Sequence, residues 1–515
     1  MLTGTYSATL AGIDAVAVEI EVHASGAGEG VNVSIVGLPD AAVRESKERI
    51  RSALYAAGLR HPEGFTLVNL APGDIRKEGT AFDLPIALAL ASAAGAFPKE
   101  TLEDAMILGE LALDSSVRAV KGVLPAALLA KQMPQIHTLI VPADNAREAA
   151  TVLPHIRVFA VNSLTDAIRA LAGELLPLSN NDGAVFLEPD WDGVPDFAEV
   201  KGQAAAKRAL EIAAAGGHNV IFIGPPGSGK SMLAQRMPGI LPPMTEEETL
   251  ETSKIHSVLG LLPPDTPLLR KRPFRAPHHT VSDAGLIGGG TNPQPGEISL
   301  AHNGVLFLDE LPEFKRSTLE VLRQPLENGE VSISRAAGSF IFPCRFLLIA
   351  AMNPCPCGHL GDRRHRCSCR SLQIQQYRAK ISGPLLDRID LHVEVKPLSN
   401  DELLTKAKGE PSVSVRERVV RARNIQAERY RYCPDIHCNA QVNTKLFHQY
   451  CAIDEGCKAL MKVAMDRLGL SARAYDRILK VARTIADLNA SPNITAEHLS
   501  EAINFRSLDR DSWGR

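Results

Sequence analysis

The sequence predicts an α/β protein of several domains, with an α+β domain at the N-terminus, an α/β domain in the middle and a helical domain at the C-terminus. The chain has 515 residues, more than one ordinary domain holds, so two to four domains are expected. Residues 219–237 run from an apolar segment through a glycine-rich turn into helical spacing, which is the order of an α/β unit. After residue 399 apolar residues recur at helical spacing.

The glycine-rich turn carries the strongest functional pattern in the chain. It fits the phosphate-binding pattern G-x-x-x-x-G-K-[ST] through Gly224, Pro225, Pro226, Gly227, Ser228, Gly229, Lys230 and Ser231. Glycines let backbone N–H groups turn toward phosphates, and the following helix offers its positive end to the anion. Lys230 places a charge at the β/γ-phosphates, and Ser231 supplies a ligand to Mg²⁺. The turn therefore predicts a site for ATP and Mg²⁺.

Composition and charge narrow the class of protein. Hydrophobic residues make up 45% of the chain and charged residues 22%, a balance typical of globular proteins. The net charge of −3 gives no sign of nucleic acid binding, so contact with DNA would need a local basic patch. No apolar run approaches the roughly 20 residues of a membrane span, and the N-terminus lacks the pattern of a secretory signal. We expect a cytoplasmic protein with no membrane partner.

Residues 1–174 predict an α+β domain. Alternating apolar residues and short apolar runs predict strands, and longer segments with helical spacing and end signals predict helices. The expected strands are 16–22, 31–36, 65–70, 137–141 and 157–161, and the expected helices are 40–58, 83–94 and 164–171. Residues 175–196 are rich in Pro, Asn and Asp, which is typical of a linker.

Two strands of the central domain, residues 197–398, end in polar residues that suit ATP hydrolysis. An apolar run ends in Asp309 and Glu310, about 75 residues after the glycine-rich turn. We expect Asp309 to hold Mg²⁺ through water and Glu310 to orient the attacking water. A second apolar run, 346–351, leads to Asn353, whose amide would position that water against the γ-phosphate. The alternative for Asn353 is a turn residue before the next proline.

An arginine near the end of the central domain is a candidate for catalysis between subunits. Arg388 lies in the segment 382–390 with acidic residues on both sides. A lone arginine there would usually form a solvated ion pair. In ring ATPases, a guanidinium from one subunit reaches the neighbour's γ-phosphate and stabilises transition-state charge, and we favour that role.

Residues 399–515 predict a helical lid over the nucleotide site. The expected helices are 415–430, 454–468, 472–488 and a last helix that Thr495 caps. Arg473 lies at the start of one lid helix and could reach the γ-phosphate of the bound nucleotide. The alternative is a solvated arginine at the start of a helix.

Four cysteines form a candidate zinc site in the loop 355–369. Four thiolates can close a tetrahedral site for Zn²⁺, and here they are Cys355, Cys357, Cys367 and Cys369. The C-x-C spacing departs from the usual C-x-x-C, and the alternative is free cysteines in a surface loop. The intervening loop is basic and includes Arg363, Arg364 and Arg366.

Two other segments of the central domain carry basic residues. Residues 274–290 mix His, Arg and Gly and could line a pore, form an interface or pack under the sheet. Residues 329–339 predict a β-hairpin that presents Arg335 near its tip. We name Arg335 and the three arginines of the cysteine loop as candidate DNA contacts.

The N-terminal domain resembles the proteolytic domain of Lon-type proteases. The stretch Pro72-Gly-Asp-Ile-Arg-Lys-Glu-Gly-Thr-Ala-Phe-Asp83 is similar to the Lon segment that bears the nucleophilic serine, and Ala81 stands at the matching position. Leu124 stands where the Lon lysine would lie. Alanine has no oxygen to attack a carbonyl, and leucine cannot act as a base. The resemblance implies a Lon-like fold without the protease chemistry.

The central and C-terminal domains resemble the AAA+ ATPases of the magnesium-chelatase and replicative-helicase branch. The ordered set of glycine loop, Asp-Glu strand, Asn353, Leu-Leu-Asp-Arg388 and Ser-Ala-Arg473 carries this likeness. Together with the Lon-like domain, the stretches Phe274-Arg-Ala-Pro-His-His-Thr-Val-Ser-Asp-Ala-Gly285 and Asn353-Pro-Cys-Pro-Cys-Gly358 resemble the ComM/YifB family. The resemblance covers nearly the whole chain.

The ComM/YifB resemblance implies a DNA motor. The family's implied activity is ATP-driven branch migration by a hexameric ring that acts on single-stranded and branched DNA during natural transformation. One alternative is a chelatase-type motor that inserts metal into a porphyrin, against which stands the expectation that such motors lack a Lon-like N-terminal unit. The other is a Lon-like ATP-dependent protease, which Ala81 and Leu124 oppose.

Overall fold

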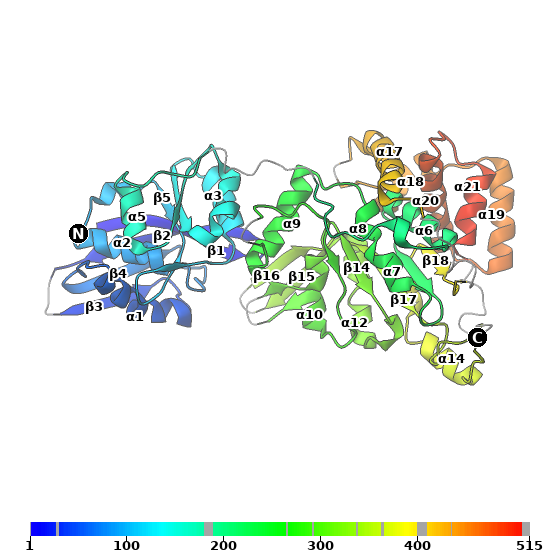
Figure 1. The fold of residues 1–515 in the computed structure, drawn as a ribbon, viewed down its shortest axis with the longest axis horizontal. Coiled ribbons are helices and arrows are strands. Elements are labelled where there is room, and N and C mark those ends of the chain that lie inside the picture. The colour runs from blue at the N-terminus through cyan, green and yellow to red at the C-terminus, as the bar shows by residue number, and fades with distance from the viewer. Residues whose placement is uncertain are drawn as a thin grey trace. The chain divides into compact units, whose positions relative to one another are not determined.

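The computed structural model divides the chain into two compact units, shown as a ribbon in Figure 1. One unit comprises Met1–Glu188 and Thr245–Arg270, and the other comprises Pro189–Met244 and Lys271–Arg515. The structure describes residues 2–26, 30–179, 189–263, 266–290, 293–335, 338–361, 365–398, 409–433 and 435–506. Each unit contains strands and helices, and the predicted α/β fold class is confirmed.

The first unit is built on a seven-stranded mixed sheet with the order β3-β4-β2-β1-β5-β8-β9. Its strands are β1 Leu2–Ala11, β2 Asp14–Ala24, β3 Val31–Val36, β4 Gly64–Ala71, β5 Ala105–Ile107, β8 Thr138–Pro142 and β9 Arg157–Val161. The pairs β1–β2 and β2–β4 are antiparallel, and the remaining pairs are parallel. All five predicted strands of this domain are confirmed, whereas β1 and β5 were not predicted.

In the first unit, helix α1 Ala41–Ala56 begins at its predicted cap, Asp40. The other α-helices within residues 30–179 are α2 Asp83–Ala93, α3 Val123–Gln132, α4 Ala146–Ala149 and α5 Leu164–Leu171. The side chain of Asp40 accepts a hydrogen bond from Val43 N at 2.8 Å, which satisfies one of the free N–H groups at the start of α1. Buried α2 begins at Asp83, which accepts two hydrogen bonds from Arg49 at 2.7 and 3.0 Å. The guanidinium therefore compensates a carboxylate inside the core.

A helix from the middle of the chain also belongs to the first unit. This helix, α9 Glu246–Leu259, begins with a capping box in which Thr245 and Glu248 exchange hydrogen bonds. At its other end, Ser257 donates through Oγ to the Glu148 carboxylate at 2.6 Å and accepts from Gly122 N at 3.0 Å. The predicted central domain, residues 197–398, includes residues 245–270, because nothing in the sequence indicates which core this segment packs against.

The second unit is built on a five-stranded sheet with the order β11-β14-β17-β10-β18. Its strands are β10 Val220–Ile223, β11 Phe274–Arg275, β14 Val305–Leu308, β17 Leu347–Met352 and β18 Leu391–Glu394. Every pair in this sheet is parallel. The strands therefore end at one edge, where α/β folds commonly bind ligands.

Helices and a hairpin surround this sheet. The helices are α6 Ala204–Gly216, α7 Lys230–Gln235, α8 Met237–Ile240, α10 Asp283–Ile287, α11 Glu297–Leu300, α12 Arg316–Glu320, α13 Arg323–Asn328, α14 Ser371–Arg378 and α15 Gly383–Leu386. The predicted hairpin forms from β15 Glu330–Arg335 and β16 Gly338–Pro343, which pair antiparallel. Among the described residues, no helix is both long enough and apolar enough to cross a membrane.

The C-terminal helices are α17 Ser412–Tyr430, α18 Thr444–Tyr450, α19 Glu455–Leu468, α20 Ala472–Leu488 and α21 Ala496–Asn504. Four of them were predicted from the sequence, and α18 was not. Apolar residues of α17, α20 and α6 share one core with the sheet. The apolar face of α20 is buried against α6, α17 and α21.

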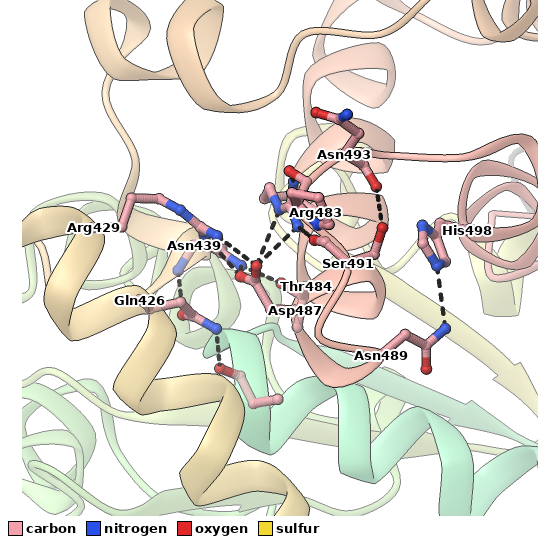
Figure 2. Close-up of polar contacts among 12 residues, drawn as sticks. Gln426, Arg429, Asn439, Arg483, Thr484, Asp487, Asn489, Ser491, Asn493 and His498 are labelled. Atoms are coloured by element: carbon pink, nitrogen blue, oxygen red, sulfur yellow. Dashed lines mark hydrogen bonds and ion pairs between the residues drawn. The ribbon is translucent and has the colours of Figure 1, made fainter.

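A buried carboxylate joins helices of the C-terminal region, as Figure 2 shows. Asp487 is 2% exposed and accepts hydrogen bonds from Arg429 at 2.8 Å, from Asn439 at 2.9 Å and from Arg483 at 3.1 Å. Asn439 also donates to Thr484 at 3.0 Å. The network therefore fixes α17 and α20 against the segment between α17 and α18.

We predict that Asp487→Ala destabilises the second unit strongly. The substitution leaves Arg429 and Arg483 buried without their shared carboxylate, which costs about 3–5 kcal/mol for a buried pair that loses one partner. Urea unfolding followed by circular dichroism measures the change. The matched control is Glu428→Ala, because Glu428 pairs with Arg431 on the surface and its loss should cost less than about 1 kcal/mol. Equal losses for the two variants would contradict a structural role for the Asp487 network.

Candidate functional site

The glycine-rich turn lies between β10 and α7, at the edge where the parallel strands end. At Gly224 an added Cβ would lie 2.1 Å from the carbonyl oxygen of Val395, so only glycine fits. Gly227 and Gly229 have φ values of 73° and 93°, a region in which other residues are strained. The turn therefore adopts a backbone that its glycines make possible.

Lys230 lies at the centre of the site and is 8% exposed. Its ammonium donates to the carbonyl oxygens of Gly224 at 2.7 Å and Pro225 at 2.9 Å, and to Asn353 Oδ1 at 3.2 Å. Burial lowers the pKa of Lys230, and the carboxylates of Asp309 and Glu310 act in the opposite direction. The structure thus brings the predicted phosphate lysine and the predicted water-positioning amide into contact.

Ser231 and Asp309 form the second contact across the site. The Ser231 hydroxyl donates to Asp309 Oδ2 at 2.6 Å. The other carboxylate oxygen of Asp309 accepts from the backbone N–H of Glu310 at 2.9 Å. A hydroxyl and a carboxylate are oxygen ligands of the kind that Mg²⁺ prefers, so the pair fits the predicted metal position.

Glu310 has an unusual backbone and a partner that the sequence analysis missed. Its φ of 51° lies in the left-handed region, which non-glycine residues rarely adopt. Its carboxylate lies 3.6 Å from Nδ1 of His279, and 56% of the side chain is exposed. His279 belongs to the segment 274–290, whose role was undecided, and the pair His278-His279 shortly after β11 was the available signal.

The two predicted catalytic arginines lie apart from this cluster. Arg388 is 6% exposed, donates to the carbonyl oxygen of Pro384 at 2.6 Å and forms an ion pair with Glu327. Arg473 lies in the first turn of α20, and its guanidinium is 3.8 Å from the carboxylate of Asp387. No contact within the described ranges joins either arginine to Lys230. Their predicted roles remain predictions.

The four predicted zinc ligands lie together. Sγ of Cys355 is 3.4 Å from that of Cys357 and 3.7 Å from that of Cys367, and the four sulfur atoms lie within 4.8 Å of one another. Zinc–sulfur bonds of about 2.3 Å in a tetrahedron place sulfur atoms about 3.8 Å apart. Backbone N–H groups of His359 and Ser368 lower the pKa of Cys357 to about 5, whereas burial raises the pKa of Cys355 to about 12. The cluster therefore fits Zn²⁺ in spacing and in chemistry.

The candidate DNA contacts are only partly within the described structure. Arg366 is exposed in the cysteine loop, near Cys367. Arg363 and Arg364 lie outside the described residues. Arg335 ends β15 at the tip of the hairpin, and its side chain is also outside the described part.

Two positions of the first unit bear on the protease alternative. Ala81 lies just before α2, where its carbonyl oxygen accepts a hydrogen bond from Gly109 N at 3.0 Å. Leu124 is fully buried in α3, and its backbone N–H donates to the Glu148 carboxylate at 3.1 Å. Burial raises the pKa of Glu148, and its hydrogen bonds act in the opposite direction. Neither position carries a nucleophile or a base in its side chain.

Each of three parts of the chain matches a family model of the magnesium-chelatase subunit ChlI. Residues 196–403 match the model of the family described as magnesium chelatase, subunit ChlI. Residues 409–506 match that of the ChlI C-terminal region, and residues 20–145 match that of subunit ChlI of Mg-chelatase. The last match weakens the argument from sequence that a chelatase motor should lack the N-terminal unit.

Two relatives align with almost the full length of this chain, and a third aligns with part of it. The chain is 45% identical over 512 residues to competence protein ComM of Haemophilus influenzae, covering 98% of this chain and 97% of the relative. It is 41% identical over 506 residues to the YifB protein of Salmonella typhimurium, covering 97% and 96%. A magnesium-chelatase ChlI subunit of Euglena gracilis is 22% identical over 209 residues, which cover 36% of this chain and 53% of that protein.

Proposed function

The chain belongs to the ComM/YifB family, and from that premise we propose that it is an ATP-driven DNA motor that promotes branch migration. We propose further that it assembles as a hexameric ring in the cytoplasm and acts on single-stranded and branched DNA. Its biological role is then the integration of incoming DNA during natural transformation and homologous recombination. The word competence in a relative's name supports that role. The observation that carries the ATPase part is the contact of Lys230 with Asn353 beside the Ser231–Asp309 pair.

ATP binding exchanges the partners of Lys230. The ammonium now donates to the carbonyl oxygens of Gly224 and Pro225, and the β/γ-phosphates would replace them with anionic oxygens. Ser231 and Asp309 would hold Mg²⁺, which neutralises charge on the phosphates. Backbone N–H groups of the glycine loop and the N-terminus of α7 then complete the phosphate site.

Hydrolysis requires a carboxylate and an amide on the attacking water. Glu310 would accept a proton from that water or polarise it, and Asn353 would fix its position. Asn353 already lies within 3.2 Å of Lys230, so both groups can face the same phosphate. The reaction thus depends on polar residues that follow three neighbouring strands.

Assembly into a ring would supply the remaining positive charge. Arg388 is held by Glu327 in the isolated chain and would have to leave that carboxylate to reach a neighbouring site. Arg473 is 68% exposed in its side chain and would contact nucleotide from the lid. A head-to-tail interface of this kind closes into a ring when its rotation permits.

The cysteine cluster would brace the loop that follows Asn353. Zn²⁺ bound by Cys355, Cys357, Cys367 and Cys369 would tie the two ends of the basic loop together. This arrangement would present Arg366 and its neighbours as a rigid basic surface. Phosphate contacts of that kind weaken steeply as the salt concentration rises.

Two alternatives are less well supported. A metal-inserting chelatase is less well supported by pairwise identity, because the ChlI subunit is 22% identical over 36% of the chain, whereas the ComM and YifB relatives are 45% and 41% identical over nearly all of it. A protease is opposed by Ala81 and Leu124, whose side chains cannot perform acyl transfer.

We predict that the wild-type protein hydrolyses ATP and that forked DNA stimulates it. Glu310→Gln should bind ATP normally but lose most turnover, since loss of water activation typically costs 10²–10⁴-fold in rate. Lys230→Ala should instead weaken ATP binding itself. Steady-state ATPase rates and nucleotide binding, with DNA, a porphyrin or an unfolded protein as the added ligand, separate the three functions. Stimulation by porphyrin or unfolded protein but not by DNA would contradict the DNA-motor proposal.

We predict that two inactive variants complement each other if Arg388 acts on the neighbouring subunit. Arg388→Ala and Lys230→Ala should each have little ATPase activity. In a mixture, some interfaces pair an intact glycine loop with an intact arginine, so part of the activity should return. Sedimentation or light scattering confirms that both variants assemble. An inactive mixture of assembled variants would contradict the shared site.

We predict about one zinc ion per chain in protein purified under reducing conditions without chelator. Elemental analysis measures the metal, and Cys357→Ser should lower the content because one of four ligands is lost. The matched control is Cys344→Ser, because Cys344 is a buried cysteine outside the cluster and should leave zinc content unchanged. Zinc-free wild-type protein would rule out the site.

A further inference from the structure

The cysteine cluster and the glycine-rich turn are joined by the end of β17. The carbonyl oxygen of Met352, the last residue of β17, accepts a hydrogen bond from the N–H of Gly224 at 3.2 Å. Asn353 follows, and its Oδ1 accepts from Lys230 at 3.2 Å. Two residues further along the chain is Cys355, the first residue of the cluster, which is fully buried. Two positions of the glycine-rich turn are therefore held by the segment that leads directly into the cluster.

A third contact joins the cluster to the middle of the glycine-rich turn. The N–H of Gly358 donates to the carbonyl oxygen of Cys355 at 2.9 Å, which closes a tight turn of residues 355–358. Gly358 is buried and has a φ of 83°. A Cβ added there would lie 2.6 Å from Cδ and 2.8 Å from Cγ of the Pro226 ring, so the position admits only glycine. Pro226 therefore packs directly on the turn that carries Cys355 and Cys357.

The shape of the turn 355–358 depends on what holds its cysteines. The backbone N–H of Cys357 donates to Sγ of Cys369 at 3.4 Å, and Sγ of Cys357 lies 3.6 Å from that of Cys367. Thiols form only weak hydrogen bonds, whereas zinc–thiolate bonds fix four sulfur atoms in a tetrahedron. Bound Zn²⁺ would therefore fix this turn and, through it, the positions of Pro226 and Asn353.

We infer that Zn²⁺ at the cysteine cluster and ATP at the glycine-rich turn bind cooperatively within one chain. The inference rests on the two sites of the proposed function. ATP requires the backbone N–H groups of the glycine-rich turn to point at its phosphates, and a turn 355–358 that zinc has already ordered lowers the entropy cost of that arrangement. Loss of zinc therefore weakens ATP binding. By thermodynamic linkage, ATP tightens zinc binding by the same factor.

The test measures ATP and zinc binding to the full chain, with a non-hydrolysable ATP analogue and excess Mg²⁺ so that turnover plays no part. Removal of zinc by a zinc-selective chelator should raise the Kd of the analogue by about 5- to 150-fold, the usual range of coupling between two sites, and added zinc should restore it. In the reciprocal measurement, competition with the chelator gives the Kd of zinc, which the analogue should lower by the same factor. In Lys230→Ala the analogue should leave the Kd of zinc unchanged, because it no longer binds.

Two glycine variants separate the Pro226 contact from a general effect on the loop. Gly358→Ala should keep its zinc but bind the analogue at least about fivefold more weakly, because the new methyl group displaces Pro226. The matched control is Gly361→Ala, since Gly361 has a φ of 80° but a Cβ added there meets nothing within 4 Å. That variant should bind zinc and the analogue within about twofold of wild type. Thermal denaturation establishes that each variant is folded.

The outcomes distinguish this inference from the proposed function. If folded wild-type protein binds zinc and ATP but each leaves the Kd of the other within about twofold, the inference is wrong and the proposed function stands. If the protein binds no zinc or no ATP, that part of the proposed function fails and the inference fails with it. Should zinc-free protein or Gly358→Ala unfold, the reciprocal measurement on wild-type protein decides between these results. Equal losses of ATP affinity in Gly358→Ala and Gly361→Ala would overturn the role of the Pro226 contact.

Discussion

The parallel pairing of β14, β17 and β10 is the constraint on which the nucleotide site depends. Each strand is buried and apolar, and each is followed by polar residues at the same edge. The register sets Val305 opposite Leu347 and Val220 opposite Ile349. A shift of one residue in either pair would turn every side chain to the other face of the sheet. The contacts of Lys230 with Asn353 and of Ser231 with Asp309 therefore follow from strand pairing, not from neighbouring positions in the chain.

In the resting site, Lys230 and Ser231 already have polar partners within the protein. Lys230 donates to two backbone carbonyls and to Asn353, and Ser231 donates to Asp309. A buried ammonium without such partners would be costly, so these contacts stabilise the glycine loop before nucleotide arrives. ATP and Mg²⁺ must then offer these groups better partners than they already have. The contact between Glu310 and His279 belongs to the same resting set.

The sequence predicts features that one stretch of chain determines. The helix α20 has the bounds predicted for it, and α1 begins at the predicted cap Asp40, because periodicity and capping are local properties. The glycine loop and the cysteine cluster are likewise contained in short motifs. Helix α6 and strand β1 were not predicted.

Contacts between segments that are distant in the chain could not be predicted from the sequence and are seen only in the structure. His279 follows β11 and Glu310 follows β14, so their contact joins the ends of two different strands. The ion pair of Arg388 with Glu327 joins the segment after α15 to α13. Neither pairing has a sequence signature, since an arginine near acidic residues is common and a histidine pair is compatible with several roles. The strand order that brings β11 beside β14 is what decides the partner of Glu310.

The path of the chain ties the two units together at more than one point. It passes from one unit to the other at 188–189, at 244–245 and at 270–271. The segment between the last two crossings contains α9, which packs in the first unit. There, Ser257 of α9 contacts Glu148. The segment Thr245–Arg270 begins shortly after α8 and ends shortly before β11. Helix α8 comes after the glycine loop in the chain, and β11 comes before His279. The first unit therefore holds the middle of a segment whose two ends lead to Lys230 and to His279.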